Sequence, residues 1–147
     1  LFYEQLDQEY AVYSKKKVPF SLIVMDIDHF KNINDTYGHA FGDEVICQVA
    51  DIIKSIDIPC QCARYGGEEF AIILSDTKLS SAVETAEKIR VQFEKTSFQT
   101  ADGIRQFSIS VGAAEVSDEC SGGKDIFLKA DEQLYRAKQN GRNRVCS

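Results

Sequence analysis

Two short apolar runs, each bordered by carboxylates, constrain the fold of this 147-residue chain more than any other feature. Residues 20–25 are rich in branched apolar side chains, and the run stops abruptly at Asp26. It is too short for a lone helix and is typical of a strand buried on both faces. A second strand of this kind is expected over residues 69–74, where apolar residues follow Glu68 and Glu69. Both strands therefore place acids beside a buried sheet.

The rest of the chain alternates between helical and extended patterns. Apolar residues recur at helical spacing in four segments, which are residues 2–13, 43–56, 82–93 and 127–137. Asp43 suits the first turn of the second helix, and Gly141 suits the C-terminal cap of the last. The pair Gly66-Gly67 predicts a hairpin turn, and residues 107–113 alternate as a strand does. This order predicts an α/β (α+β) fold in which helices surround a central mixed sheet.

Composition limits the classes of partner. The length suits a single domain, and the net charge of −6 repels polyanions, so neither DNA nor RNA is an expected partner. A small anionic ligand remains possible because metal ions and a few backbone amides can neutralise its charge locally. The five cysteines lack a zinc-like pattern and are expected to be reduced thiols. No segment approaches the ~20 apolar residues of a membrane span, so we expect a cytoplasmic domain without membrane contact, although a longer parent protein can be membrane-attached.

The acids at the two strand ends are the first candidates for chemistry. Carboxylates from separate strands that meet at one sheet edge can share hard cations such as Mg²⁺, an arrangement suited to phosphoryl transfer. Alternation predicts that Asp26 and Asp28 face the same way if the strand continues to Asp28, and that Glu68 and Glu69 face opposite ways. Either segment alone is equally consistent with surface caps and hairpin charges. Their pairing shifts the balance toward a metal site.

The polar, glycine-punctuated segment of residues 31–43 can form a wall of a ligand site. Its Asp43 can accept hydrogen bonds from N1 and N2 of guanine, and the Asn34 amide can serve the remaining edge. Adenine lacks that pair of donors. The alternative is that Asp43 caps the next helix and Asn34 satisfies a turn, which the residues alone favour.

Two cations near the C-terminus, Lys138 and Arg142, are four residues apart and can face phosphates from one side of a helix. An exposed basic helix end is the usual explanation for such a pair. His29 and His39 show no metal-ligand spacing, so structural or solvent-facing roles are favoured. The chain has no nucleophilic serine motif, P-loop or dinucleotide fingerprint, which disfavours common kinases, hydrolases and dehydrogenases.

These motifs together resemble the GGDEF diguanylate cyclases over nearly the whole chain. The matching segments are Asp26-Ile27-Asp28-His29-Phe30-Lys31, Asn34-Asp35, Gly38-His39, Gly42-Asp43, Gly66-Gly67-Glu68-Glu69-Phe70, Ala130-Asp131-Glu132, Leu134-Tyr135, Ala137-Lys138 and Gly141-Arg142-Asn143. The resemblance implies one catalytic domain over residues 1–147. It also implies a fold similar to polymerase palms and adenylate cyclases, with a GGEEF hairpin.

The resemblance also implies the metal ligands and the base readers. Asp26, the backbone carbonyl of Ile27 and Glu68 are expected to hold Mg²⁺, with Mn²⁺ as a possible substitute. Glu69 is expected to support the metal site and catalysis. Asn34 and Asp43 resemble the family's guanine readers.

Phosphate contacts and the reaction follow from the same resemblance. Backbone amides of His29, Phe30 and Lys31, and those of the Gly66-Gly67 turn, are expected to approach the phosphates. Lys31, Lys138 and Arg142 would offset phosphate charge, and Glu68 would assist deprotonation. The implied reaction joins two GTP into cyclic di-GMP, releasing pyrophosphate, when the 3′-hydroxyl of one attacks the α-phosphate of the other. Because each domain holds one GTP, a homodimer is required, with a sensor or dimerisation domain upstream.

Two departures from the family pattern matter. The R-x-x-D motif of the product-inhibition site would fall at Asp57 and Cys60, so product binding is not expected there. The family's leading D-x-L-T-G-L-x-N-R segment does not precede Leu1, so we expect an N-terminally truncated domain that is a weak cyclase. Two other functions stay open: a noncatalytic GTP-binding or protein-interaction module, and a cyclase that accepts ATP.

Overall fold

The two apolar runs form neighbouring central strands in the structure, a computed structural model that describes residues 1–57 and 60–147. The helices are α1 (Phe2–Lys16), α2 (Phe30–Tyr37), α3 (His39–Lys54), α4 (Leu79–Glu94) and α5 (Gly123–Gln139). The strands are β1 (Phe20–Ile27), β2 (Gln61–Arg64), β3 (Glu69–Ser75), β4 (Phe98–Thr100), β5 (Gly103–Arg105), β6 (Ile109–Glu115) and β7 (Val145–Cys146).

The main sheet has the strand order β2-β3-β1-β6-β7. Strand β1 lies antiparallel to both β3 and β6, whereas β7 is parallel to β6, so the predicted mixed sheet is confirmed. The register sets Asp26 opposite Glu69 of β3 and opposite Ser110 of β6. Acids from two distant segments therefore meet at one end of the sheet.

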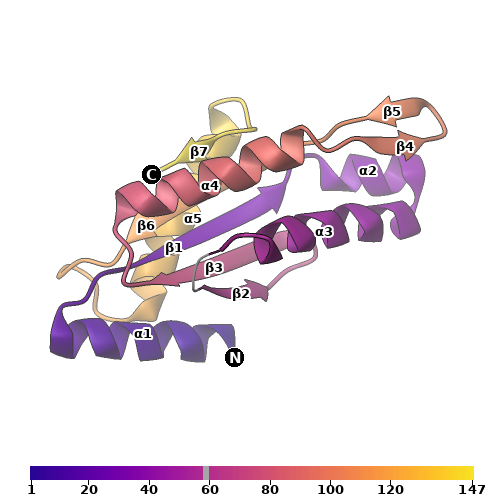
Figure 1. Cartoon of the computed structure of the whole chain (residues 1–147). Coiled ribbons are helices and arrows are strands. Elements are labelled where there is room, and N and C mark those ends of the chain that lie inside the picture. Colours follow the sequence, from indigo (N-terminus) through magenta and orange to yellow (C-terminus); the bar gives the residue numbers. More distant parts are fainter. Residues whose placement is uncertain (58–59) are drawn as a thin grey trace.

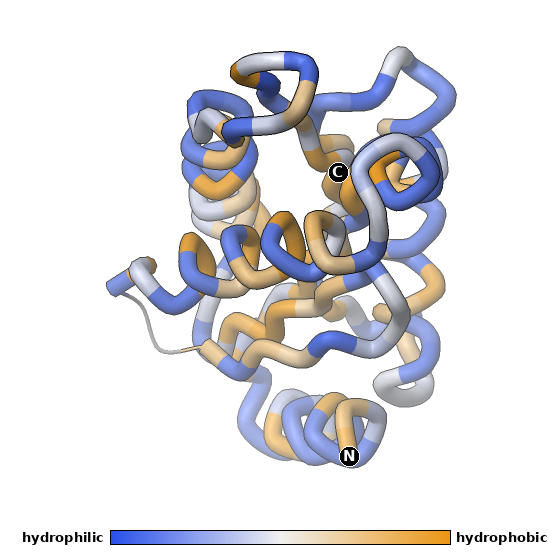
Figure 2. The backbone as a smooth tube through the Cα atoms, turned by 90° about the vertical axis from the view of Figure 1, so that its right-hand side faces the viewer, coloured by the Kyte–Doolittle hydropathy of each residue, from blue (hydrophilic) through white to orange (hydrophobic). Residues whose placement is uncertain are grey.

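Helices cover both faces of this sheet, as Figure 1 shows with α4 in front of the sheet and α5 behind it. Alternate residues of β1 divide between two apolar clusters: Ile23, Met25 and Ile27 pack with residues of α3 and α4, whereas Leu22 and Val24 pack with residues of α1 and α5. In Figure 2 the hydrophobic stretches gather toward the centre of the molecule, with hydrophilic segments on its periphery. Burial on both faces explains why β1 reads as a continuous apolar run.

The elements around the site differ from the sequence prediction in two places. Helix α3 begins at His39, so Asp43 lies in its second turn and the prediction of a first-turn position was wrong. The segment before it contains the short helix α2, which the polar composition did not reveal. Gly38, with φ of 89° and ψ of 163°, separates the two helices because this backbone conformation, which glycine adopts freely, interrupts the helical path.

The remaining predictions hold with shifted boundaries. The last predicted strand begins at Ile109 rather than residue 107, and the turn before it belongs to a separate hairpin of β4 and β5. Gly141, with φ of 116°, follows the C-cap of α5, and the backbone N–H of Arg142 donates to the carbonyl of Ala137 at 2.9 Å. In the described part of the chain, no helix combines the length and apolarity that crossing a bilayer requires.

Candidate functional site

Asp26 occupies the centre of the candidate site, near the end of β1. Its carboxylate is largely buried and accepts a hydrogen bond from the Lys138 ammonium of α5. Burial raises the pKa of Asp26, and the negative charges of Glu68 and Asp28 add to this, while the ion pair with Lys138 opposes it. The net rise means that the contact with Lys138 does not offset the cost of burying this carboxylate beside two other acids.

The hairpin between β2 and β3 brings the other acids to the same place. Burial raises the pKa of Glu69, and the nearby charges of Asp26 and Glu68 raise it further. The Glu69 carboxylate folds over Gly66, where a Cβ atom would lie only 2.2 Å from Oε2. The backbone N–H of Ile27 donates to the carbonyl of Glu68 at 3.4 Å, which joins the hairpin to β1.

Arg64 closes the glycine turn and was missed by the sequence analysis. Its Nε and Nη2 donate to the carbonyl of Gly67 at 3.0 and 2.7 Å. The two glycines differ in their surroundings, because no atom lies within 4 Å of a Cβ built on Gly67. A side chain at position 66 would therefore displace the end of the Glu69 side chain, whereas one at position 67 would displace nothing. The position of Arg64 beside the glycine pair was the available sequence signal.

The oxygen atoms collected at this edge suit a hard divalent cation. In the described ranges, no group of three or more His, Cys, Asp or Glu side chains is arranged to hold a metal ion. The donor set, however, consists of carboxylates and a backbone carbonyl, which are the ligands that Mg²⁺ prefers. The raised pKa values of Asp26 and Glu69 indicate that added positive charge would be favourable there. The site chemistry therefore fits a magnesium ion, and the expected ligand set stays a prediction.

The expected guanine readers lie together on α2 and α3. Asn34 points its Oδ1 into a buried position where it has no hydrogen-bond partner. Gly42 of α3 makes room for this oxygen, since a Cβ there would lie 1.9 Å from it. Asp43, the next residue, is exposed. Because α3 begins four residues before Asp43 and Asn34 lies inside α2, neither the cap nor the turn alternative describes these residues.

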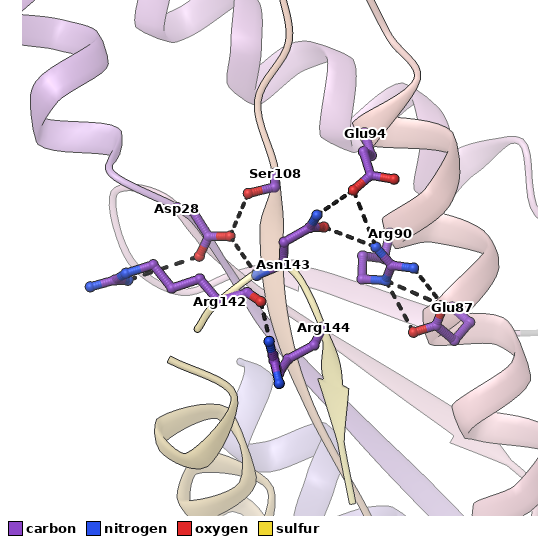
Figure 3. Close-up of polar contacts among 8 residues, drawn as sticks. All are labelled: Asp28, Glu87, Arg90, Glu94, Ser108, Arg142, Asn143 and Arg144. Carbon is purple, nitrogen blue, oxygen red and sulfur yellow. Dashed lines mark hydrogen bonds and ion pairs between the residues drawn. The ribbon is translucent and has the colours of Figure 1, made fainter. Parts of the chain in front are cut away.

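The two C-terminal cations reach the acidic end of the sheet. Lys138 contacts Asp26, and Nη1 of Arg142 lies 3.9 Å from Oδ1 of Asp28. Figure 3 shows the Arg142 side chain extending past Asp28 from the turn that follows α5. These contacts connect the pair to the candidate site, so an isolated basic helix end does not describe it.

The first residues after β1 lead into α2, and their side chains differ in exposure. His29 has φ of 56° and precedes α2, which begins at Phe30. His29, Lys31 and His39 are exposed, in agreement with the solvent-facing histidines that the sequence predicted. The structure brings Phe30 beside Gly42, so its ring packs between α2 and α3. Within the described residues, the Lys31 side chain joins none of the ion pairs around Asp26.

Asp28 is surrounded very differently from Asp26. Its carboxylate accepts hydrogen bonds from the hydroxyls of Ser108 at 2.7 Å and Ser110 at 2.6 Å, and from the backbone N–H of Asn143 at 3.0 Å. The side chain is only 2% exposed. The sequence did not identify these partners because they are 80 to 115 residues away in the chain.

A cavity of about 380 Å³ opens beside this carboxylate. Asn32, Ile33, Thr36 and Tyr37 of α2 line it, whereas Asn34 does not. The other lining residues are Asp28, His29, Glu94, Gln106, Phe107, Ser108 and Asn143. The cavity is therefore separate from the place where Asn34 approaches Gly42.

Comparisons with known proteins agree with this arrangement. Residues 1–144 match the family described as "Diguanylate cyclase, GGDEF domain". The chain is 46% identical over 132 residues to diguanylate cyclase A of Treponema denticola, covering 89% of this chain and 36% of that protein. It is 41% identical to the response regulator PleD of Caulobacter vibrioides, covering 86% of this chain and 29% of that protein. The chain thus spans about a third of the length of these curated relatives.

Solved structures of the same fold complete the comparison. The active GGEEF domain of a diguanylate cyclase from Vibrio cholerae superimposes with a TM-score of 0.93 at 36% identity, covering 98% of this chain and 92% of that one. The GGDEF domain of DgcB from Caulobacter crescentus, in complex with c-di-GMP, gives a TM-score of 0.93 at 38% identity, covering 99% of this chain and 84% of that one. The sequence motifs, the fold and these relatives agree, and the chain belongs to the GGDEF diguanylate cyclase family.

Proposed function

We propose that this domain condenses two GTP molecules into cyclic di-GMP and pyrophosphate. The observation that carries the proposal is the pairing of Asp26 with Glu69 across β1 and β3, at a sheet edge where burial and the charges of neighbouring acids raise the pKa of both. Such a site favours the arrival of positive charge, which a triphosphate substrate needs. The named cyclases among the relatives support the same reaction.

Magnesium is the cofactor that fits this site, with Mn²⁺ as a substitute. Asp26, Glu68 and the carbonyl of Ile27 would hold it, and Glu69 would support them from the facing strand. When bound, magnesium offsets negative charge on the phosphates and on the attacking and leaving oxygens. Lys138 would then exchange its contact with Asp26 for a phosphate oxygen, since the ammonium is already at the site.

Guanine recognition rests on the unpartnered oxygen of Asn34. Guanine carries an N1–H and an N2 amino group, which together offer three hydrogens on one edge. The Asp43 carboxylate would accept one from each nitrogen, and Asn34 Oδ1 would accept the remaining N2 hydrogen. A buried acceptor without a partner costs free energy, so binding guanine recovers a hydrogen bond that the free protein lacks.

The reaction itself needs two copies of the domain. The 3′-hydroxyl of one GTP attacks the α-phosphorus of the other and pyrophosphate leaves, with Glu68 as the group that accepts the hydroxyl proton. Lys31, Lys138 and Arg142 offset the phosphate charge, while amides of residues 29–31 and of the Gly66-Gly67 turn contact the phosphates. Because each domain presents one GTP, activity requires a homodimer, which a sensor or dimerisation domain of a longer protein would promote.

A product assay tests this proposal directly. Concentrated or artificially dimerised protein is incubated with GTP and Mg²⁺, and the product is identified by its mass. We expect cyclic di-GMP from the wild type and none from Glu68→Gln. Dimerised wild-type protein that binds GTP without consuming it would contradict the proposal and would indicate a noncatalytic GTP-binding module.

A second assay tests the choice of base. Wild type and Asp43→Ser are compared for turnover of GTP and ATP at equal concentrations. We expect the wild type to prefer GTP strongly and the variant to lose most of that preference, because the carboxylate that receives the guanine hydrogens is gone. Equal turnover of the two nucleotides by the wild type would refute guanine recognition by this residue pair.

A further inference from the structure

The turn after α5 has an unusual backbone. Three consecutive residues have positive φ angles: Gly141 at 116°, Arg142 at 65° and Asn143 at 45°. Glycine adopts this region freely and asparagine tolerates it, but arginine rarely does. Such a conformation persists only where the surroundings hold it in place. The contacts that hold this turn in place therefore indicate its role.

Asp28 holds the turn from the side of the sheet. Its Oδ2 accepts the backbone N–H of Asn143 at 3.0 Å, and the Arg142 guanidinium lies 3.9 Å from Oδ1. The Ser108 and Ser110 hydroxyls fix the carboxylate itself at 2.7 and 2.6 Å. All but 2% of the Asp28 side chain is buried, so these protein groups, rather than solvent, satisfy its charge.

Helix α4 holds the same turn from the other side, as Figure 3 shows. Asn143 Oδ1 accepts a hydrogen bond from Nη1 of Arg90 at 2.9 Å, and its Nδ2 donates to Glu94. Arg90 is fixed in turn by ion pairs with Glu87 at 2.9 Å and Glu94 at 3.5 Å. The backbone and the side chain of Asn143 are thus held by different elements.

We propose that Asp28 is a positioning residue, which holds the Arg142–Asn143 turn so that Arg142 faces the phosphates of the nucleotide. This inference rests on the proposed function and deepens it. The Arg142 side chain is 38% exposed and lies beyond tight hydrogen-bond distance of Asp28, so its guanidinium is free to bind an anion while its backbone stays fixed. A cation on a preorganised backbone loses less conformational freedom when a ligand binds.

The competing explanation is that the network only stabilises the fold. A matched pair of serines separates the two explanations. Ser110 and Ser21 are both fully buried in the main sheet and each donates one hydrogen bond, Ser110 to Asp28 and Ser21 to the carbonyl of Thr77 at 2.9 Å. Ser21→Ala removes a similar hydrogen bond at the opposite end of β1. Only Ser110→Ala should therefore change phosphate binding.

Affinity for two probes measures the effect without relying on turnover. The α,β-methylene analogue of GTP carries the triphosphate, whereas guanosine carries only the base and sugar. In Asp28→Asn we expect affinity for the analogue, with Mg²⁺ present, to fall about 10- to 100-fold while affinity for guanosine changes little. Ser110→Ala should show a smaller loss of the same kind, and Ser21→Ala none. Equal losses for both probes, or equal effects of the two serine variants, would overturn the positioning role.

Hydrogen exchange gives an independent readout on the turn. The Asn143 amide should be protected in the wild type and should exchange much faster in Asp28→Asn.

If Asp28→Asn does not fold, the variants Asn143→Ala and Asn143→Gly test the same turn in its place. Alanine disfavours the positive φ, so Asn143→Ala should weaken binding of the GTP analogue. Glycine adopts that φ and keeps the backbone N–H, so Asn143→Gly should bind the analogue more tightly than Asn143→Ala. No rescue by glycine would overturn the proposal.

The two possible failures remain distinguishable. A wild-type protein that binds the analogue no better than guanosine would refute the proposed nucleotide site itself. A wild type that prefers the analogue, with that preference unchanged in Asp28→Asn, would refute only the positioning role.

Discussion

Asp26 and Asp28 lie two residues apart at the end of β1, yet the protein uses their carboxylates in opposite ways. Asp26 pairs with one side chain, Lys138, which is itself part of the candidate site. Asp28 is saturated by two serine hydroxyls and a backbone amide from distant segments. The Asp26 carboxylate therefore has one side-chain partner, whereas the Asp28 carboxylate accepts three hydrogen bonds. One strand end thus carries both the acid that we propose binds the metal and the acid that we propose holds the turn after α5.

The pleat of β1 explains why both acids turn toward the end of α5. The even-numbered residues of this strand pack against the α1 and α5 side, and the partners of Asp26 and Asp28 come from α5 and the turn that follows it. This agrees with the predicted common orientation of the two side chains. What separates them is that the hydroxyls of Ser108 and Ser110, around the start of β6, donate their hydrogen bonds to Asp28 and not to Asp26.

The largest expected effect is that of Asp26→Asn on turnover. We expect cyclic di-GMP formation to fall at least about 100-fold, the upper end of what is lost when a group merely orients a metal ligand. Thermal stability should stay equal or rise, because burial already disfavours the charged form of Asp26. Product mass and the midpoint of thermal unfolding measure the two effects. A clear loss of stability with retained turnover would reverse the assignment of the two acids.

The matched variant Asp28→Asn should also lower the free energy of unfolding, in addition to its expected effect on phosphate binding. Asparagine cannot accept all three hydrogen bonds, and each bond to a charged group contributes about 1.5–3 kcal/mol. We expect a net loss of about 2 kcal/mol in urea unfolding, since some partners regain water. If Asp28→Asn lost less stability than Asp26→Asn, the contrast between the two carboxylates would be wrong.

Gly66→Ala tests whether the position of the Glu69 carboxylate matters for turnover. The new Cβ would lie 2.2 Å from the Glu69 carboxylate, which must move away from its place opposite Asp26. A displacement of this order should lower turnover about 10-fold, with a small change in unfolding temperature. Gly67→Ala is the control, because its Cβ would meet no atom within 4 Å. Equal effects of both substitutions would mean that turn flexibility, and not the position of Glu69, limits activity.

The smallest expected effect is a pH dependence of the stability difference between Asp26→Asn and the wild type. A carboxyl whose pKa is raised by folding contributes its full stability below about pH 4 and loses it as pH rises through the folded-state pKa. The asparagine does not titrate. The unfolding temperature of the variant relative to the wild type should therefore rise from acidic to neutral pH and then level off. A difference that shrinks with rising pH would show that Lys138 dominates the environment of Asp26.

Local patterns in the sequence determined much of this molecule. The apolar runs that became β1 and β3, the glycine hairpin and the helical stripes of α1, α4 and α5 all depend on near neighbours, so spacing was enough to predict them. The acids at Asp26, Glu68 and Glu69 were found for the same reason. Two short elements were not predicted from the sequence, because α2 lies in a polar segment and β7 is too brief to show alternation.

Tertiary structure alone decided what each acid does. Lys138 reaches Asp26 across 112 residues, and Asn143 reaches Asp28 across 115. Nothing in the local sequence distinguishes the two carboxylates, because their difference arises from which distant donors the sheet and α5 bring to each. The sequence therefore determined that charged groups end this strand, and long-range packing determined which of them accepts three hydrogen bonds and which contacts a single lysine.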